Sequence, residues 1–509
     1  MISVVNTASL SGLSGAMVRV ETGLFRQIPG IHITGLASQT IVESRDRIRS
    51  AIKQSGFPFP DQKIIINLVP ASQKKEGSHF DLPLTIGILS ASGVVKISNG
   101  ERKAFVGELS LDGTLHPVKG ALPLVKGLRD GGIQEVFLPG GNLAEASLVP
   151  GIRLKAVVHL REVVEFLRKG EEIRDAPYYG DTGRRPAFSL DFQEVRGQEA
   201  AKRAIMLAVA GGHHLFMMGH PGSGKTMLAK RIPTIMSPMN REEEMEVTSI
   251  YSVAGELKEE EPLLQTRPFR CPHHTITASA MVGGGNVPRP GELSLAHHGV
   301  LFLDEFPEFS RRVLEMMRQP LEVGEVALSR NRQRVTYPCR ILLVTASNPC
   351  PCGHYGDARQ ECSCRPAQIH QYQSKISGPL LDRIDMQLKI PPVSPEELWE
   401  EGSMLRRMSS EEMRTKVCLL EEIQRERYGR ERDYRNGSIP PTLIEKFCPM
   451  SADARKFLEM AFRTLGLSVR GYHKVIKCAR TIADLSEKEV IREEHIGEAI
   501  QYRIMDREK

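Results

Sequence analysis

The chain has 509 residues, which is too long for one ordinary hydrophobic core, so we expect roughly two to four domains. A composition of 40% hydrophobic and 26% charged residues excludes a largely disordered chain. The formal net charge of +6 is small for this length, so a nucleic-acid site has to be argued from local charge.

The N-terminus shows no secretion signal, and no apolar stretch approaches the roughly 18 residues of a membrane-spanning helix. The nine cysteines are odd in number and clustered, which is typical of a reducing compartment rather than of a disulfide framework. We therefore expect a cytoplasmic protein without a membrane partner.

Short strands and helical patterns alternate over the first third of the chain, which predicts an α+β domain over residues 1–167. The predicted elements, three strands and then two helices, are 63–68, 104–107, 135–138, 38–55 and 82–91. The next stretch, 168–189, is rich in glycine, proline and charge and predicts a linker.

A predicted strand at 215–218 is followed by a glycine-rich loop and a helix. The loop reads Gly219, His220, Pro221, Gly222, Ser223, Gly224, Lys225 and Thr226. Glycines let backbone N–H groups surround a phosphate, and the helix N-terminus adds partial positive charge. Lys225 can reach the β- and γ-phosphates, and Thr226 can hold Mg²⁺. The pattern therefore predicts a nucleotide site rather than an ordinary glycine-rich turn.

Two further apolar strands end in polar residues. After the first come Asp304, which can bind Mg²⁺ through water, and Glu305, which can polarise the water that attacks the γ-phosphate. After the second comes Asn348, which can hold that water at the edge where open α/β sheets bind ligands. The alternative for Asn348 is a cap of the turn before Pro349.

Between these strands, residues 322–338 predict a β-hairpin whose tip presents Arg330, Arg332 and Arg334. In a ring, three arginines per tip would line a pore and track DNA phosphates without sequence preference. The alternative is a solvated hairpin whose charges protect a sheet edge.

Four cysteines, Cys350, Cys352, Cys362 and Cys364, lie within 15 positions. Four thiolates can hold a structural Zn²⁺ and leave no open position for catalysis. The two C-x-C pairs are tighter than the usual ligand spacing, so four reduced thiols in a loop remain the alternative.

After Pro391 the chain becomes helical and strongly charged, which predicts a small helical domain over 392–509. The predicted helices are 397–408, 411–428, 452–465, 471–485 and 493–502. Two arginines stand in motifs similar to those of ring-forming AAA+ ATPases: Arg383 in an arginine-finger box and Arg470 in a second-sensor motif. An isolated surface salt bridge is the alternative for each.

These motifs resemble those of the YifB/ComM family of magnesium-chelatase-like AAA+ proteins, over nearly the whole chain. Its further marks are 193–204, 268–275, 283–285, 290–297 and 348–353. The resemblance implies an α/β AAA+ P-loop module over 190–391, between an N-terminal Lon-protease-like α+β domain and a C-terminal helical lid domain. It also implies ATP and Mg²⁺, and a hexameric ring of identical subunits that acts on DNA.

The Lon-like region does not reproduce a protease site. Ser78 does not fall on the nucleophile position, Leu122 stands where the lysine base belongs, and Lys119 is offset by three residues. A serine without a base is a poor nucleophile. The resemblance therefore implies a pseudo-protease domain.

We expect an ATP-hydrolysing DNA motor, most simply a hexameric helicase that migrates branches in recombination or in uptake of transforming DNA. One alternative is a chelatase-type ATPase that remodels a protein partner. The others are an ATP-dependent protease, which lacks its Ser–Lys pair, and a scaffold that binds ATP without hydrolysis, against which Asp304, Glu305 and Arg383 argue.

Overall fold

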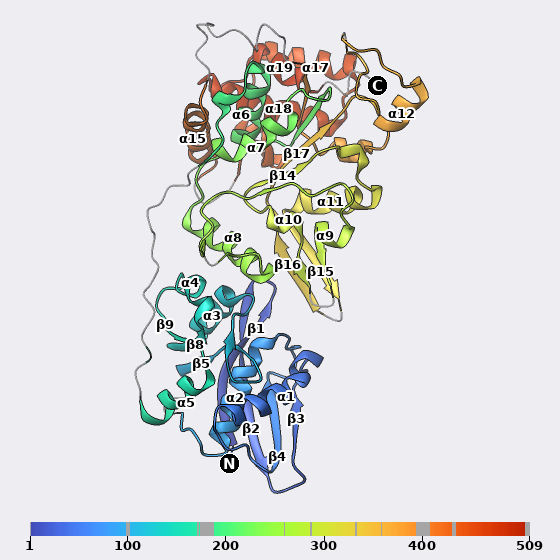
Figure 1. Cartoon of the computed structure of the whole chain (residues 1–509). Helices are drawn as coiled ribbons and strands as arrows, with labels where there is room; N and C mark the ends of the chain where they lie inside the picture. The colour runs from blue at the N-terminus through green and yellow to red at the C-terminus, as the bar shows by residue number, and fades with distance from the viewer. Residues whose placement is uncertain are drawn as a thin grey trace.

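The computed structural model describes residues 2–97, 102–170, 173, 188–258, 260–285, 288–330, 333–357, 359–392, 408–429 and 434–503. The molecule is elongated, with the N-terminal domain at one end and the C-terminal helices at the other (Figure 1). Within these ranges, no helix is both long and apolar enough to cross a membrane.

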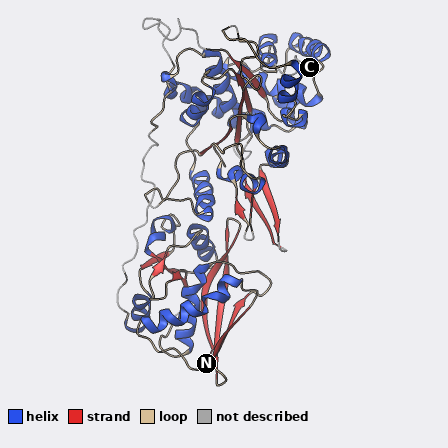
Figure 2. Ribbon diagram, turned by 45° about the vertical axis from the view of Figure 1, so that its right-hand side comes forward, coloured by secondary structure: helices blue, strands red, loops and turns tan. Residues whose placement is uncertain are grey.

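The N-terminal domain is built on a seven-stranded mixed sheet, in the order β3-β4-β2-β1-β5-β8-β9. Alternate residues of β8 enter different hydrophobic cores: Val136 and Leu138 face one, and Phe137 faces the other. At β8 both faces of the sheet are therefore covered, and helices pack against the sheet (Figure 2). The strands are β1 (Ile2–Ser11), β2 (Ser14–Phe25), β3 (Gly30–Thr34), β4 (Lys63–Val69), β5 (Lys103–Phe105), β8 (Glu135–Pro139) and β9 (Arg153–Val157), with a separate pair β6 (Glu108–Leu109) and β7 (Leu115–His116). The helices are α1 (Gln39–Gln54), α2 (Asp81–Ala91), α3 (Ala121–Asp130), α4 (Leu143–Ala146) and α5 (Leu160–Lys169).

The longest strands of this domain, β1 and β2, were not predicted from the sequence. They form an antiparallel hairpin in which Ile2 faces Gly23 and Ser11 faces Ser14. Helix α5 runs to Lys169, and most of the predicted linker 168–189 lies outside the described residues.

The central module has a five-stranded parallel sheet in the order β11-β14-β17-β10-β18. Its first strand in the sequence, β10, lies between β17 and β18, so the strand order reverses beside it. Ligands of such sheets bind at the carboxyl ends of the strands near that reversal. The strands are β10 (Leu215–Gly219), β11 (Phe269–Arg270), β14 (Val300–Leu303), β17 (Leu342–Ser347) and β18 (Met386–Ile390). The helices are α6 (Glu199–Gly211), α7 (Lys225–Ile235), α8 (Arg241–Ala254), α9 (Ala278–Val282), α10 (Glu292–Leu295), α11 (Arg311–Val323), α12 (Pro366–Gln373) and α13 (Gly378–Leu381).

Two short hairpins stand apart from this sheet. The first pairs β12 (Gly283–Gly284) with β13 (Arg289–Pro290), and the second, at the predicted place, pairs β15 (Glu325–Arg330) with β16 (Gln333–Pro338).

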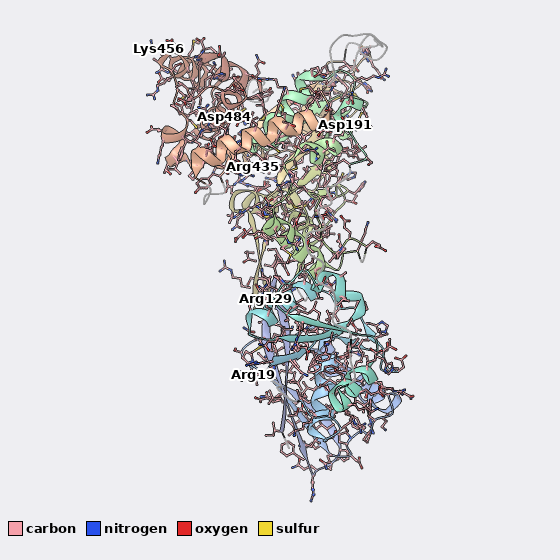
Figure 3. The ribbon with its side chains drawn as sticks, turned by 90° about the vertical axis from the view of Figure 1, so that its left-hand side faces the viewer. Arg19, Arg129, Asp191, Arg435, Lys456 and Asp484 are labelled. Atoms are coloured by element: carbon pink, nitrogen blue, oxygen red, sulfur yellow. The ribbon has the colours of Figure 1, made fainter. Side chains whose placement is uncertain are left out.

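The C-terminal helices share one hydrophobic core with the central module. Ala204 of α6, Val417 of α15 and Ile482 of α18 all belong to it. At the start of α15 the Asp191 carboxylate accepts a hydrogen bond from the Ser410 N–H at 3.0 Å (Figure 3). Arg435, which follows this helix in the chain, packs back on it with Nη2 at 3.1 Å from the Glu421 carboxylate. The helices are α15 (Ser410–Tyr428), α16 (Ile444–Phe447), α17 (Ala452–Leu465), α18 (Val469–Leu485) and α19 (Glu493–Gln501). The helix predicted at 397–408 falls almost entirely outside the described residues.

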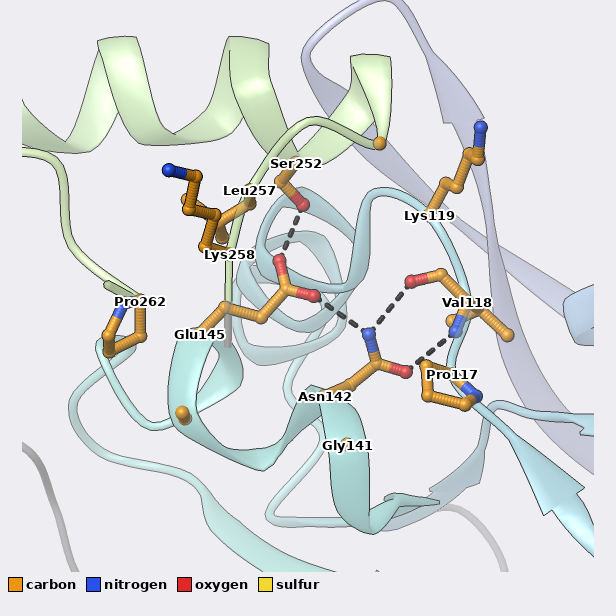
Figure 4. A pocket seen from close by; sticks show the side chains of 12 residues that line it. Pro117, Val118, Lys119, Gly141, Asn142, Glu145, Ser252, Leu257, Lys258 and Pro262 are labelled. Carbon is orange, nitrogen blue, oxygen red and sulfur yellow. Dashed lines mark hydrogen bonds between the residues drawn. The ribbon is translucent and has the colours of Figure 1, made fainter. Parts of the chain in front are cut away.

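A buried carboxylate joins the N-terminal domain to α8. The Glu145 side chain accepts hydrogen bonds from the Ser252 hydroxyl at 2.5 Å and from the Asn142 amide at 2.8 Å (Figure 4). It also accepts from the Leu122 N–H at 3.3 Å, while Asn142 is fixed by two bonds to the backbone of Val118. Burial raises the pKa of the Glu145 carboxyl above its ordinary value, and these donors oppose the shift.

We expect Glu145→Gln to weaken this docking contact by about 1–3 kcal/mol. Both carboxylate oxygens accept hydrogen bonds, whereas a glutamine amide has only one oxygen. Its NH₂ group would therefore face another N–H donor, from either Leu122 or Asn142. Hydrogen exchange should become faster in α8 and around Leu122, but not in α18. Glu459→Gln, on the exposed face of α17, removes the same charge and should change neither region. Equal exchange in Glu145→Gln and the parent would show that docking does not depend on the carboxylate.

A small apolar cluster makes the second contact between the domains. Leu10 and Leu13, at the tip of the β1–β2 hairpin, pack with Val253 at the end of α8 and with Val335 and Tyr337 of β16. The hairpin β15–β16 therefore rests on the N-terminal domain along the middle of its length.

Candidate nucleotide site and cysteine cluster

The phosphate loop joins β10 to α7 at the carboxyl edge of the central sheet. Gly222 and Gly224 have φ angles of 77° and 89°, in the left-handed region that favours glycine. A Cβ on either would meet nothing within 4 Å, so the backbone conformation rather than lack of room requires glycine there. Open space therefore lies over the loop, as a phosphate chain needs.

Lys225 is the first residue of α7 and its ammonium group lies inside the loop. It donates hydrogen bonds to the carbonyl oxygens of Gly219 at 2.6 Å and His220 at 2.9 Å. It also donates to the Asn348 side-chain oxygen at 3.2 Å, which links the loop to the end of β17. Burial lowers the pKa of Lys225, and the nearby Asp304 carboxylate opposes that shift. A bound phosphate would add counter-charge to this buried cation.

The residues predicted for Mg²⁺ and for water activation lie at the same edge. The Thr226 hydroxyl donates to the Asp304 carboxylate at 2.7 Å, so the two predicted magnesium ligands are in direct contact. Glu305 has a φ of 51°, a conformation that non-glycine residues adopt rarely and that is frequent at functional sites. Its carboxylate lies 3.2 Å from Nδ1 of His274, which follows β11.

Arg383 and Arg470 lie at the opposite edge of the sheet. Arg383 precedes Met386, which is paired with Leu215 at the first residue of β10, whereas the phosphate loop follows the last residue. Both guanidinium groups face Glu322: its Oε1 lies 2.7 Å from Arg383 Nη2 and 3.8 Å from Arg470 Nη2. The structure thus brings the two arginines together, but apart from the other predicted site residues.

These arginines line a cavity of about 700 Å³ between the central sheet and the C-terminal helices. Other cations of its wall are Arg267, Arg340, Arg435, Lys474 and Lys477. Several have acidic partners, such as Lys474, whose Nζ lies 3.0 Å from the Asp385 carboxylate. The concentration of cations makes this face suited to an anionic group.

The arginines of the predicted pore hairpin are described only in part. Arg334 is exposed on β16, where it faces Ser329 of β15. Arg332 and the side chain of Arg330 lie outside the described part.

The four clustered cysteines converge. The Sγ atom of Cys350 lies 3.4 Å from that of Cys352 and 3.7 Å from that of Cys362, and the last two are 3.6 Å apart. With Cys364, the four sulfur atoms all lie within 4.8 Å of one another. The sequence spacing therefore does produce one cluster.

The predicted protease positions do not form a serine–lysine pair. Ser78 donates a hydrogen bond to the Glu108 carboxylate, and Leu122 is fully buried. Lys119 lies against Gly255, at the end of α8.

Three contacts of the site were missed by sequence reasoning: His274 at Glu305, Glu322 between the arginines, and His220 Nδ1 at 2.8 Å from the Gly353 carbonyl oxygen. His220 stands inside the recognised loop, but its partner is more than 130 positions away. His274 belongs to the family motif 268–275, which is the one pattern that could have drawn attention to it. Glu322 carries no local pattern.

Comparisons with known proteins cover nearly all of the chain. Three family profiles match: "Magnesium chelatase, subunit ChlI" over 191–398, "Subunit ChlI of Mg-chelatase" over 20–142 and "Magnesium chelatase, subunit ChlI C-terminal" over 407–503. The protein YifB of Salmonella typhimurium is 39% identical over 507 residues, 99% of this chain and 98% of that protein. Competence protein ComM of Haemophilus influenzae is 40% identical over 513 residues, again 99% and 98%. Lon protease 2 of Bacillus subtilis is 24% identical over 196 residues, 35% of each chain.

Proposed function

Because the chain belongs to the YifB/ComM family of magnesium-chelatase-like AAA+ ATPases, we propose that it is a ring-forming, ATP-driven DNA motor. The predicted fold class is confirmed: an AAA+ module with a Lon-like N-terminal domain and a helical C-terminal region. The finer proposal is a hexameric helicase that migrates DNA branches. The name of the related competence protein ComM supports a role in processing DNA taken up by the cell.

The observation that carries this proposal is the separation of the two halves of the ATP site. β10 has five residues, so its ends lie roughly 13 Å apart at about 3.3 Å per residue. The phosphate loop is at one end and Arg383 and Arg470 are at the other, so these arginines are poorly placed for their own subunit's nucleotide. They could instead contact the nucleotide bound to a neighbouring subunit. Repetition of this contact between subunits would close a ring.

Within the proposed site, each residue has a physical task. The loop N–H groups and Lys225 would bind the phosphates of ATP, and Thr226 with Asp304 would hold Mg²⁺, which supplies charge neutralisation on the phosphates. Glu305 would accept a proton from the attacking water, and Asn348 would orient that water. Arg383 and Arg470 of the adjoining subunit would then stabilise charge on the transferring phosphoryl group.

The proposed DNA contact is the β15–β16 hairpin, with Arg334 and the predicted Arg330 and Arg332 at its tip. Exposed arginines bind phosphates without sequence preference, and six copies around a ring would form a basic lining. The middle of the hairpin packs on the N-terminal domain, so that domain would support it as a pseudo-protease with a structural role.

A second candidate is a chelatase-type ATPase that remodels a protein partner. It is favoured by the descriptions of the three matching profiles, all of which name magnesium chelatase. An ATP-dependent protease is disfavoured because the partner of Ser78 is a carboxylate rather than an amine.

The discriminating experiment measures ATP hydrolysis with and without a labelled four-way DNA junction, and follows strand exchange in the same sample. We expect turnover to rise with the junction and the strands to separate. Arg334→Ala should weaken DNA binding uniformly across sequences and reduce its salt dependence, by about one phosphate contact per altered arginine. Arg463→Ala, on the exposed face of α17, is the matched control and should bind DNA like the parent. Turnover that does not respond to DNA would favour the protein-remodelling candidate.

We further propose that the four-cysteine cluster holds a structural Zn²⁺. A cytoplasmic location, expected from the sequence, also stays a proposal.

A further inference from the structure

We infer that Zn²⁺ bound by the four cysteines braces the phosphate loop, so that metal occupancy sets the ATP turnover of the subunit. The element concerned is the cysteine loop, residues 349–357 and 359–364. This inference rests on the proposed zinc and ATP sites and adds a coupling between them.

The arrangement of the four thiols fits a bound metal. A tetrahedral zinc with Zn–S distances near 2.3 Å places its sulfur atoms about 3.8 Å apart. The observed Sγ–Sγ distances of 3.4, 3.6 and 3.7 Å are close to that value, and far longer than the roughly 2.05 Å of a disulfide. The Tyr355 N–H also points at Cys350 Sγ, at 3.3 Å, as backbone donors do around metal thiolates.

The cysteine loop, as far as it is described, has no regular secondary structure to hold it. From Cys350 to Cys364 its described residues form neither helix nor strand. Four converging thiols without a metal make only weak hydrogen bonds, because sulfur is a poor donor and acceptor. A bound metal would therefore tie the two ends of this loop together more firmly than the thiols alone.

The cysteine loop is in direct contact with the phosphate loop. His220 Nδ1 faces the Gly353 carbonyl oxygen at 2.8 Å, which requires a proton on Nδ1. A Cβ on Gly353 would come within 2.6 Å of Pro221 Cγ, so only glycine allows this close approach. Because Gly353 follows Cys352 directly, a metal bound to Cys352 would hold the Gly353 carbonyl oxygen in place for His220.

The same loop begins at the proposed water-orienting residue. Asn348 stands two positions before Cys350, and its side chain accepts the hydrogen bond from Lys225. The Pro349 carbonyl oxygen is held separately by Gln373 Nε2 at 3.1 Å. Loss of the metal would release the segment that begins at Cys350, and with it the support of His220. Misplacement of such groups by about 1 Å can cost 10²-fold in rate.

The test uses the full-length protein, purified without chelators, and measures zinc per chain, affinity for a fluorescent ATP analogue and steady-state turnover. We expect about one zinc per chain in the parent. Cys364→Ser should lose zinc and show a kcat/KM for ATP that is roughly 10- to 100-fold lower. His220→Ala should keep its zinc and show a similar loss. The control Cys418→Ser, on α15 outside the cluster, should match the parent in all three measurements.

Circular dichroism of each variant separates these effects from unfolding. A parent that takes up no zinc, even when zinc is added, would overturn the inference. So would zinc-free Cys364→Ser with normal analogue affinity and turnover, or His220→Ala with parental kinetics. A parent without any ATP turnover would instead count against the proposed function, and zinc content with analogue affinity would still decide the coupling.

Discussion

Replacing Arg383 with alanine should lower ATP turnover by about 10³- to 10⁵-fold, the range known for arginine fingers. In the isolated subunit this guanidinium is held by Glu322 and by the carbonyl oxygens of Arg318 and Pro379. Its loss would leave charge on the neighbouring subunit's transferring phosphoryl group without stabilisation, while that subunit's own phosphate loop stays intact. Binding of an ATP analogue should therefore change much less than turnover.

The decisive form of this experiment mixes two inactive variants. Lys225→Ala subunits have a damaged phosphate loop and an intact arginine face, and Arg383→Ala subunits have the reverse. If Arg383 acts on the neighbour's nucleotide, mixed rings contain some complete sites. Turnover should then reappear, to an extent set by the ratio of the two variants. A mixture as inactive as its components would contradict action between subunits.

Two controls define what the Arg383 result means. Arg383→Lys keeps the charge but loses the planar, forked donor group, so it should rescue little turnover. Arg312→Ala, exposed on α11, removes an arginine of the same charge and should leave turnover unchanged.

Replacing Glu305 with glutamine should lower turnover by about 10²- to 10⁴-fold, the usual contribution of a general base. The amide keeps the size and the hydrogen-bonding reach of the side chain but cannot accept the proton of the attacking water. Binding of ATP should persist, because the loop and the Thr226–Asp304 contact are untouched. The protein should therefore accumulate with ATP bound, which single-turnover measurements with labelled ATP would detect.

Glu308→Gln is the matched control for this substitution. Glu308 lies three residues further on, at the end of the short 3₁₀ helix that Glu305 caps, and its carboxylate pairs with Lys375 at 3.0 Å on the surface. A surface pair of this kind contributes little, so turnover should stay within about twofold of the parent. Full turnover in Glu305→Gln would remove Glu305 from its proposed role.

The sequence by itself determined the parts of the site that depend on local pattern. The phosphate loop, Asp304, Glu305 and Asn348 each follow an apolar run, and an apolar run of that length indicates a buried strand. Because parallel strands place their carboxyl ends at one edge, the meeting of these residues could be expected without coordinates. The family was recognised from the same motifs, and the comparisons confirm it.

Other features were decided only by the tertiary structure. The hairpin β1–β2 escaped prediction because buried polar residues, such as Thr7, Ser9 and Thr22, interrupt the apolar alternation that marks a strand. The docking of Glu145 on Ser252 joins residues 107 positions apart. Neither the hairpin nor this contact is marked by a periodic pattern of residues in the sequence.

The arrangement of charges was likewise decided only by the tertiary structure. Arg383 and Arg470 could be named from their motifs, but their shared partner Glu322 and their distance from the phosphate loop emerge only when α11, α18 and β18 pack together. His220 and Gly353 likewise meet because two loops fold onto the same sheet edge. Hydrogen bonds and ion pairs depend on distances of about 3 Å between side chains, and the fold alone sets such distances between residues far apart in the chain.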